Sequence, residues 1–256
     1  MKISSTTIRR LKGVARTLGV YFVAREVYRA FSPMVRARVR ADRALFSTIV
    51  SPGDLVFDIG VNLGQKSRCF LALGARVVAV EPNPNCLAHL RRSFAGNLGY
   101  TLVPAAIGAA TGRARLNFAG TDPSASLRDD WTLRGGTVES VDVDVVTLDS
   151  LVEAHGTPDY VKMDVEGFEP EAPRGLTTPL PLLSAEYHLD RKDDLLDCLA
   201  LREALGPIAV NVIAIHGGEM VLPDWVTPDD FRSLVARREI PAAGDVFIRA
   251  VPADAV

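Results

Sequence analysis

The sequence predicts an α/β domain with a mostly parallel sheet and helices on both faces of that sheet. From residue 54 onward, short apolar runs rich in β-branched residues alternate with segments whose apolar residues recur at helical spacing. This alternation is typical of buried parallel strands joined by crossover helices. A glycine-rich turn follows the first run, and such sheets bind ligands at this position. The chain has 256 residues, 48% of them hydrophobic, which suffices for one domain with a sizeable core.

The first half of the alternation contains five expected strands and two expected helices. Pro84 suits the first turn of a helix, and Leu87, Leu90 and Phe94 share one face of the segment that follows it. Leu148 begins a second, shorter helix. The expected strands are residues 55–58, 77–81, 100–107, a stretch within 108–118, and 138–146, with a loop at 119–137.

The second half continues the pattern with four expected strands and two helices. Leu195 and Leu199 share a helix face, and an inserted helix begins near residue 228. Thr227 precedes that helix as a capping residue, Pro228 lies in its first turn and Asp230 occupies its third position. The expected strands are residues 159–165, 182–188, 208–215 and 246–251.

Two acids flank a glycine-containing turn near the start of the domain. Asp58 ends the first apolar run and Glu81 ends the second, and Gly60, Asn62 and Gly64 lie in the turn between them. Glycine lets the backbone approach a ligand closely, and an acid at the second position accepts both hydrogen bonds of a ribose diol. A dinucleotide site needs G-x-G-x-x-G to hold a pyrophosphate at the helix N-terminus. Asn62 breaks that pattern, and a carboxylate at Asp58 suits an ammonium or a sulfonium better than a pyrophosphate.

Two later strands carry polar side chains although their other residues are apolar. Lys162 and Asp164 share one face of the strand 159–165, about 6.5–7 Å apart, and Glu186 and His188 share a face of the next strand. If the strands are neighbours, their carboxyl ends gather Asp164, Glu166, Glu186 and His188 beside the glycine turn. The structural alternative is an ion pair of Lys162 with Asp164 or Glu186 that merely compensates a buried charge.

Several segments of the chain share the pattern of one protein family. The pattern consists of D-I-G-V-N-L-G at 58–64, E-P-N-P at 81–84, P-A-A-I-G at 104–108, S-A-S at 124–126, V-T-L-D-S-L at 146–151 and D-Y-V-K-M-D-V-E-G-F-E at 159–169. The first segment resembles motif I of class I methyltransferases. Together the segments resemble the FkbM family of methyltransferases, and the last segment is more specific than the glycine turn alone.

The resemblance implies a class I methyltransferase fold. This fold is a Rossmann-like three-layer sandwich around a seven-stranded, mostly parallel sheet with an antiparallel last strand. The resemblance also implies S-adenosylmethionine as the methyl donor and a hydroxyl of a sugar, glycoside or secondary metabolite as the acceptor. The glycine turn would then approach the methionine part, Glu81 would bind the ribose diol and residues 105–107 would border the adenine. The expected cofactor-binding residues are Asp58, Gly60, Asn62, Gly64, Ser67, Glu81, Pro82 and Ala106.

Methyl transfer to a hydroxyl depends on positioning and on a base that removes the acceptor's proton. His188 is the first expected base, because the unperturbed pKa of histidine lies near neutrality, and Asp164 is the second. The expected catalytic set is His188, Asp164, Glu186 and Lys162. In an alternative arrangement, Asp164, Glu186 and His188 bind one magnesium or manganese ion that acidifies the hydroxyl.

Two rival function classes stay open. One is an NAD(P)-dependent oxidoreductase that uses a degenerate dinucleotide turn. The other is a non-catalytic protein that keeps the fold and binds S-adenosylmethionine without turnover. Binding tests with the two cofactors and a test for methyl transfer distinguish these classes.

Residues 1–50 are expected to form a basic helical arm ahead of a methyltransferase domain at 51–256. In residues 1–43, eleven Lys and Arg side chains are opposed only by Glu26 and Asp42. Leu11, Leu18 and Phe22 recur at helical spacing. The arm packs on the domain, or it contacts an anionic membrane surface, an acidic partner or another subunit. Scattered arginines without interleaved aromatic residues argue against nucleic acid as a partner.

The three cysteines and the hydropathy favour a reducing compartment. Cys69, Cys86 and Cys198 are far apart and show neither a disulfide framework nor zinc-ligand spacing. No apolar stretch reaches the roughly 18 residues that a membrane span requires. A cytoplasmic protein is the simplest interpretation.

Overall fold

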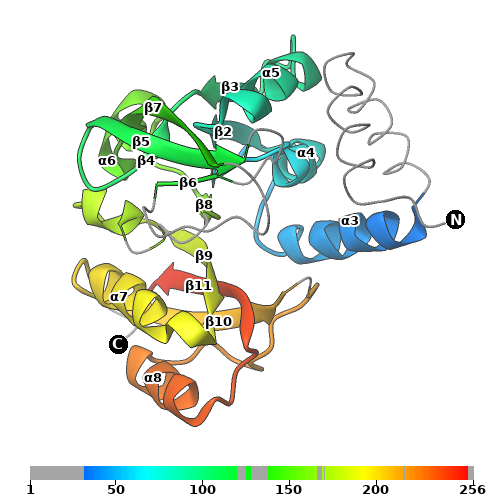
Figure 1. The fold of residues 1–256 in the computed structure, drawn as a ribbon. Coiled ribbons are helices and arrows are strands. Elements are labelled where there is room, and N and C mark those ends of the chain that lie inside the picture. The colour runs from blue at the N-terminus through cyan, green and yellow to red at the C-terminus, as the bar shows by residue number, and fades with distance from the viewer. Residues whose placement is uncertain are drawn as a thin grey trace, which may run out of the picture. The chain divides into compact units, whose positions relative to one another are not determined.

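The computed structural model describes residues 32–119, 125–127, 138–165, 169, 171–215 and 217–252 (Figure 1). By its contacts the chain divides into two units, Met1–Ala41 and Asp42–Val256. Helix α3 (Pro33–Phe46) begins in the first unit and ends in the second. The amphipathic helix expected around Leu11, Leu18 and Phe22 lies outside the described residues. Among the helices described, none combines the length and the apolar character needed to cross a membrane.

The described part of the second unit is built around a seven-stranded sheet in the order β10-β11-β9-β8-β1-β2-β3. The strands are β1 (Leu55–Ile59), β2 (Arg76–Val80), β3 (Tyr100–Val103), β8 (Tyr160–Met163), β9 (Leu182–His188), β10 (Ile208–Ala214) and β11 (Ala243–Ala250). Strand β11 is antiparallel to both of its neighbours, and the other pairs in the sheet are parallel. This arrangement confirms the expected sheet with an antiparallel last strand.

A second sheet of four strands corrects the prediction of one continuous strand at 100–107. Its order is β4-β7-β5-β6, and its strands are β4 (Ala106–Ile107), β5 (Gly112–Ala119), β6 (Ala125–Ser126) and β7 (Val138–Val146). Strand β3 ends at Val103, and β4 pairs with β7 instead of β2. Pro104 lies between them and has no N–H to continue the ladder. The chain therefore leaves the first sheet at this proline.

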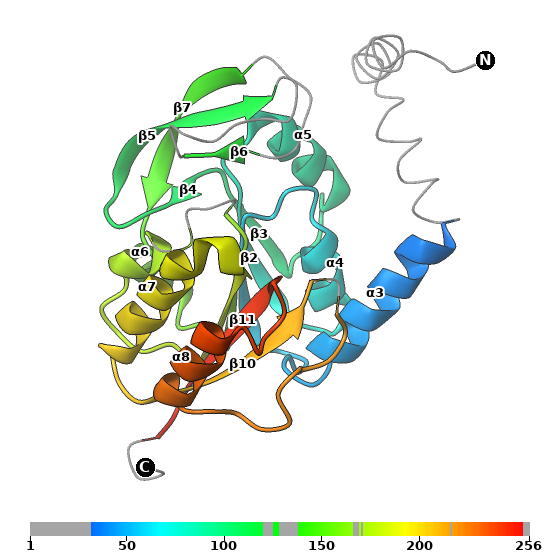
Figure 2. The same ribbon diagram turned by 60° about the horizontal axis from the view of Figure 1, so that its bottom comes forward.

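Helices cover both faces of the seven-stranded sheet. The helices are α4 (Gln65–Ala72), α5 (Pro84–Ser93), α6 (Leu148–His155), α7 (Lys192–Glu203) and α8 (Pro228–Arg237), with short 3-10 helices at Ala172–Gly175 and Leu189–Arg191. Helices α4 and α5 lie on one side of the sheet, and α6 and α7 lie on the other (Figures 1 and 2). The Thr227 side chain accepts a hydrogen bond from the Asp230 N–H, which confirms the expected cap of α8. All five residues of β1 are buried, because both faces of this central strand are covered.

We expect residues 42–256 to fold without residues 1–41. Within the second unit, Lys66 donates a 2.6 Å hydrogen bond to Asp42, and the Phe46 ring, 2% exposed, lies 4.9 Å from the Phe70 ring. A truncation that begins at residue 42 keeps both contacts, whereas one that begins at residue 48 removes them. The first protein should keep a near-ultraviolet circular dichroism spectrum with defined aromatic bands, and the second should unfold at a lower temperature. A molten or insoluble 42–256 protein would contradict this expectation.

Candidate functional site

The turn after β1 holds Glu81 in a fixed position. Glu81 follows β2, is buried, and accepts hydrogen bonds from the backbone N–H groups of Asn62 at 2.6 Å and Asn83 at 2.8 Å. Burial raises the pKa of Glu81 to about 8, although both backbone hydrogen bonds favour the ionised form. Asn62 itself adopts a left-handed conformation with φ of 55°, which asparagine tolerates better than most residues. The glycine turn and the second acid are therefore directly connected.

The two glycines of this turn are required for different reasons. Gly60 has φ of +77°, and a Cβ at this position would lie 1.7 Å from the backbone oxygen of Asp164. Gly64 has φ of +76°, and its Cβ would lie 2.5 Å from the Phe94 ring. Gly60 thus lets β1 and the segment after β8 approach each other, whereas Gly64 lets the first turn of α4 approach α5.

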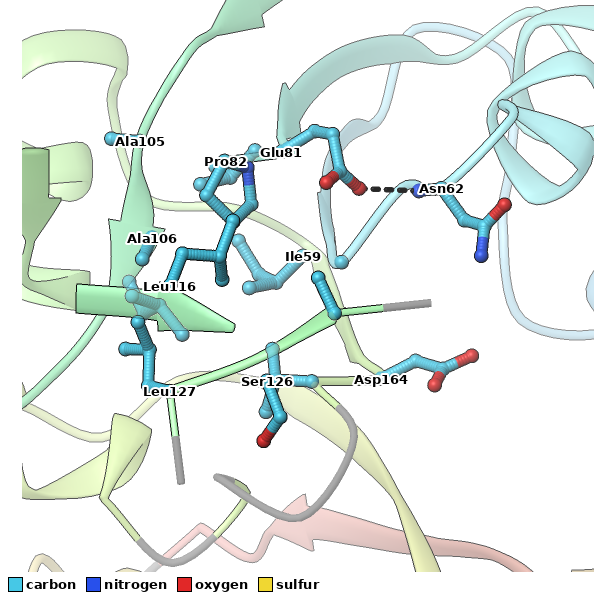
Figure 3. Close-up of a pocket in the computed structure, with 15 residues that line it drawn as sticks. Ile59, Asn62, Glu81, Pro82, Ala105, Ala106, Leu116, Ser126, Leu127 and Asp164 are labelled. Atoms are coloured by element: carbon cyan, nitrogen blue, oxygen red, sulfur yellow. Dashed lines mark hydrogen bonds between the residues drawn. The ribbon is translucent and has the colours of Figure 1, made fainter. Parts of the chain in front are cut away.

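A pocket of about 630 Å³, measured to its open mouth, lies at the carboxyl ends of β1, β2 and β8. We call it the turn pocket. It is lined by Ile59, Gly60, Asn62, Val80, Glu81, Pro82, Ala105, Ala106, Ile107, Leu116, Ala125, Ser126, Leu127, Asp164 and Val165. Glu81 and Asn62 lie at one end with Asp164 below them, and Ala106, Leu116 and Leu127 lie at the other end (Figure 3). The volume falls in the range of small-molecule sites, roughly 300–1,000 Å³.

Three of the residues expected at the cofactor lie outside the lining of this pocket. Asp58 is buried and accepts a 2.6 Å hydrogen bond from the Ser67 hydroxyl. Burial raises the pKa of Asp58, while Lys162 and the Ser67 hydrogen bond act in the opposite direction. Gly64 packs against Phe94 and also does not line the pocket. In this structure Asp58 and Ser67 fasten the end of β1 to α4 and support the turn from behind.

Lys162 and Asp164 form the ion pair that the sequence left open as the structural alternative. The Lys162 ammonium donates a 2.8 Å hydrogen bond to Asp164, and the two side chains are 4% and 40% exposed. Burial alone would lower the pKa of Lys162, but Asp164, Asp245 and Asp58 together raise it above its ordinary value. Burial has the opposite effect on a carboxylate and would raise the pKa of Asp164, but the Lys162 ammonium holds that pKa below its ordinary value. Asp164 is therefore an ionised carboxylate on the wall of the turn pocket.

Glu186 and His188 lie close to Asp164 but line a different pocket. A side-chain hydrogen bond with Glu186 contributes to the lowered pKa of Asp164, after the larger effect of Lys162. His188 Nε2 lies 3.9 Å from Glu186 Oε1, and the His188 side chain is 48% exposed. This second pocket, which we call the β9 pocket, is lined by Glu169, Ala185, Glu186, Tyr187, His188, Arg191, Asp194, Leu195, Cys198 and Val246. Glu186 thus interacts with Asp164 on one side and approaches His188 on the other, and only Asp164 lines the turn pocket. Glu166 lies outside the described residues.

The expected metal ligands do not form a cluster in the part of the chain that the structure describes. There, no group of three His, Cys, Asp or Glu side chains is arranged to hold a metal ion. The carboxylate of Asp164 contacts the Lys162 ammonium instead. The metal hypothesis therefore has no geometric support among the described residues.

Two groups of site residues were missed by the sequence analysis. Leu116 and Leu127 from the second sheet line the turn pocket, and the break at Pro104 that creates this sheet was not anticipated. Asp245 interacts electrostatically with Lys162, although the expected last strand began only at Val246. No local signal indicates this interaction, because Asp245 precedes the apolar run 246–251 and is distant from Lys162 in the sequence.

Comparisons with known proteins agree with this geometry. Residues 58–177 match the family model described as the methyltransferase FkbM domain. The hexuronic acid methyltransferase AglP of Haloferax volcanii is 31% identical over 147 residues, which are 55% of this chain and 59% of that protein. The chain thus aligns with little more than half of this curated relative.

Solved structures with a related fold have low identity to the chain. An O-methyltransferase from Bacillus cereus in complex with SAH is 12% identical, with a TM-score of 0.45, over 86% of this chain and 82% of that one. Aeropyrum pernix fibrillarin with natively bound S-adenosyl-L-methionine is 9% identical, with a TM-score of 0.45, over 82% of this chain and 74% of that one. The fold class rests on the strand order and directions of the sheet rather than on these alignments.

Proposed function

We propose that this chain is an S-adenosylmethionine-dependent O-methyltransferase, because residues 58–177 match the family model described as the methyltransferase FkbM domain. The observation that carries the proposal is the turn pocket, with Glu81 held by two backbone N–H groups at one end and apolar side chains at the other. Each carboxylate oxygen of Glu81 keeps a further lone pair, so the group accepts both hydroxyls of a ribose. Ala106, Leu116 and Leu127 offer the apolar surface that suits a purine ring.

The donor supplies an electrophilic methyl group on a sulfonium, and the residues of this chain supply position and a proton acceptor. When bound, the donor would pass this methyl group to the acceptor oxygen and would be left as a neutral thioether. The hydroxyl proton must pass to a base on the acceptor side. We assign this role to Asp164, which lines the turn pocket and is ionised. His188 is the second candidate, because it lines the β9 pocket beside Glu186.

The β9 pocket is the proposed acceptor site. It borders the turn pocket through the hydrogen bond between Asp164 and Glu186. Its polar lining combines the carboxyl groups of Glu169, Glu186 and Asp194 with Arg191 and His188, and such a set hydrogen-bonds a polyhydroxylated ligand. The name of the Haloferax volcanii relative includes a hexuronic acid, which supports a sugar as the acceptor. Methyl transfer from labelled S-adenosylmethionine to a panel of hexuronic acids, neutral glycosides and polyketides tests this proposal.

We expect the affinity for S-adenosylmethionine to rise with pH through Glu81. The pKa of Glu81 is raised to about 8 by burial, and the ionised form is the one that accepts two ribose hydrogen bonds. Binding therefore favours loss of the Glu81 proton, and affinity should rise roughly tenfold per pH unit below pH 8 and level off above it. Calorimetric titrations from pH 6 to 9 measure the slope.

Glu81→Gln is the matched control for this slope, because it keeps the shape of the side chain and removes the titration. It should lose the Glu81 contribution to the slope and, at pH 9, bind about 1.5–3 kcal/mol more weakly, the range for hydrogen bonds to a charged group. The amino group of the ligand also titrates, so the difference between the two profiles isolates Glu81. Identical profiles would remove Glu81 from the ribose site.

A further inference from the structure

Asp245 lies beside the proposed base but belongs to neither the matched family segment nor the lining of either pocket. It is near the start of the antiparallel strand β11, so it lies at the same edge of the sheet as the carboxyl ends of β8 and β9. Its Cα partners are Glu186 on β9 and Ile213 on β10. Met163 pairs with Ala185, so Asp164, Glu186 and Asp245 occupy one row across three adjacent strands.

Lys162 provides the positive charge nearest to this row. Its ammonium donates to Asp164, and the charges of Asp245 and Asp58 also stabilise it. Of these three carboxylates, only Asp164 contacts the ammonium, and Asp58 and Asp245 act on it through space. Burial raises the pKa of Asp245, and the Lys162 charge opposes this effect. The other charged or titratable groups near Asp245 come from every neighbouring element. They are Tyr160 and Lys162 on β8, Asp164 directly after β8, Glu186 and Tyr187 on β9, Lys66 on α4 and Asp42 on α3.

We propose that Asp245 is a positioning residue for the proton transfer, and the proposal rests on the function proposed above. Asp245 competes with Asp164 for the Lys162 ammonium and so keeps the Asp164 carboxylate basic enough to accept the proton of the acceptor hydroxyl. The physical reason is that an ammonium paired with a single carboxylate lowers the proton affinity of that carboxylate, and a second anion on the same ammonium offsets this effect. Asp245 touches neither the donor nor the acceptor in this arrangement.

The first test is the pH dependence of turnover in Asp245→Asn, with Asp245→Glu as the conservative variant. Asp144→Asn serves as the control, because the Asp144 side chain on β7 is 75% exposed. In Asp245→Asn, Lys162 should bind Asp164 more tightly, so the acidic limb of the kcat profile should move to lower pH. Plateau kcat should fall by at most about tenfold, because the rate of proton transfer responds only partly to a one-unit change in the pKa of the base. The affinity for S-adenosylmethionine should stay unchanged. Asp245→Glu should recover most of the activity, and Asp144→Asn should resemble the wild type.

A wild-type pH profile in Asp245→Asn would overturn the proposal, whatever the size of the loss in kcat. A merely structural defect lowers turnover without shifting the acidic limb of the pH profile.

The second test does not depend on activity. Thermal unfolding of Lys162→Met, Asp245→Asn and the double variant forms a double-mutant cycle. We expect the double variant to lower the unfolding midpoint by clearly less than the sum of the two single variants, because Lys162 and Asp245 interact. Additive shifts would overturn the proposal. Absence of methyl transfer by the wild-type protein would instead refute the proposed function. The double-mutant cycle would still decide whether Asp245 and Lys162 interact.

Discussion

Asp164→Asn should lower turnover by roughly 10²–10⁴, the usual contribution of a general base. Asparagine keeps the size of the side chain but cannot take up the hydroxyl proton. The effect on S-adenosylmethionine affinity should be much smaller, because the ribose contact at Glu81 and the glycine turn remain in place. Single-turnover measurements with saturating donor separate the chemical step from binding.

His188→Ala is the matched comparison, because it removes the other candidate base and leaves the turn pocket intact. If Asp164 is the base, the His188→Ala protein should keep most of its turnover and the wild-type pH profile. If His188 is the base, turnover should fall by the larger factor and the dependence on pH near neutrality should disappear. Near-normal turnover in both proteins would refute this proton-transfer site. A magnesium or manganese requirement that a chelator exposes would favour the metal hypothesis over both.

Gly60→Ala should destabilise the protein by roughly 3–5 kcal/mol, which is the range of severe single substitutions. Two effects add at this position. An alanine with φ of +77° is strained, and its Cβ would lie 1.7 Å from the backbone oxygen of Asp164. Backbone cannot yield as a flexible side chain can, so β1 and the segment after β8 must separate. Both segments line the turn pocket, so affinity for S-adenosylmethionine should be lost together with stability.

Gly96→Ala measures the backbone strain without the steric clash, so its comparison with Gly60→Ala gives the cost of the clash. Gly96 has φ of +76°, and a Cβ there would meet nothing within 4 Å. This variant should therefore lose only the strain contribution, about 1–2 kcal/mol, and should bind the donor normally. Denaturant unfolding of both variants gives the comparison. Equal losses in the two proteins would mean that the close approach at Gly60 does not hold the pocket together.

The sequence predicted the strands and the glycine turn well, because these depend on local patterns. Buried parallel strands read as continuous apolar runs, and the strands 138–146 and 182–188 were predicted with the bounds that the structure gives them. The cap of α8 at Thr227 was also predictable, since Thr, Pro and Asp occur at their usual positions before and within the first turn. The resemblance to the FkbM family is confirmed by the family match.

The parts that depend on contacts between distant residues were less predictable. Alternation places Lys162 and Asp164 on one face, but only the packed sheet brings Asp245 from β11 close enough to act on the same ammonium. The same limit applies to Asp58, whose carboxylate bonds Ser67 behind the turn. Local spacing determines the strand face of a residue but not what covers that face.

Calorimetric titration of the wild-type protein with S-adenosylmethionine and with NADH tests the central claim most directly. The turn pocket, with an acid that binds a ribose and without the glycine spacing of a dinucleotide site, predicts micromolar affinity for S-adenosylmethionine and no detectable binding of NADH. Tight binding of NADH with no response to S-adenosylmethionine would contradict the account.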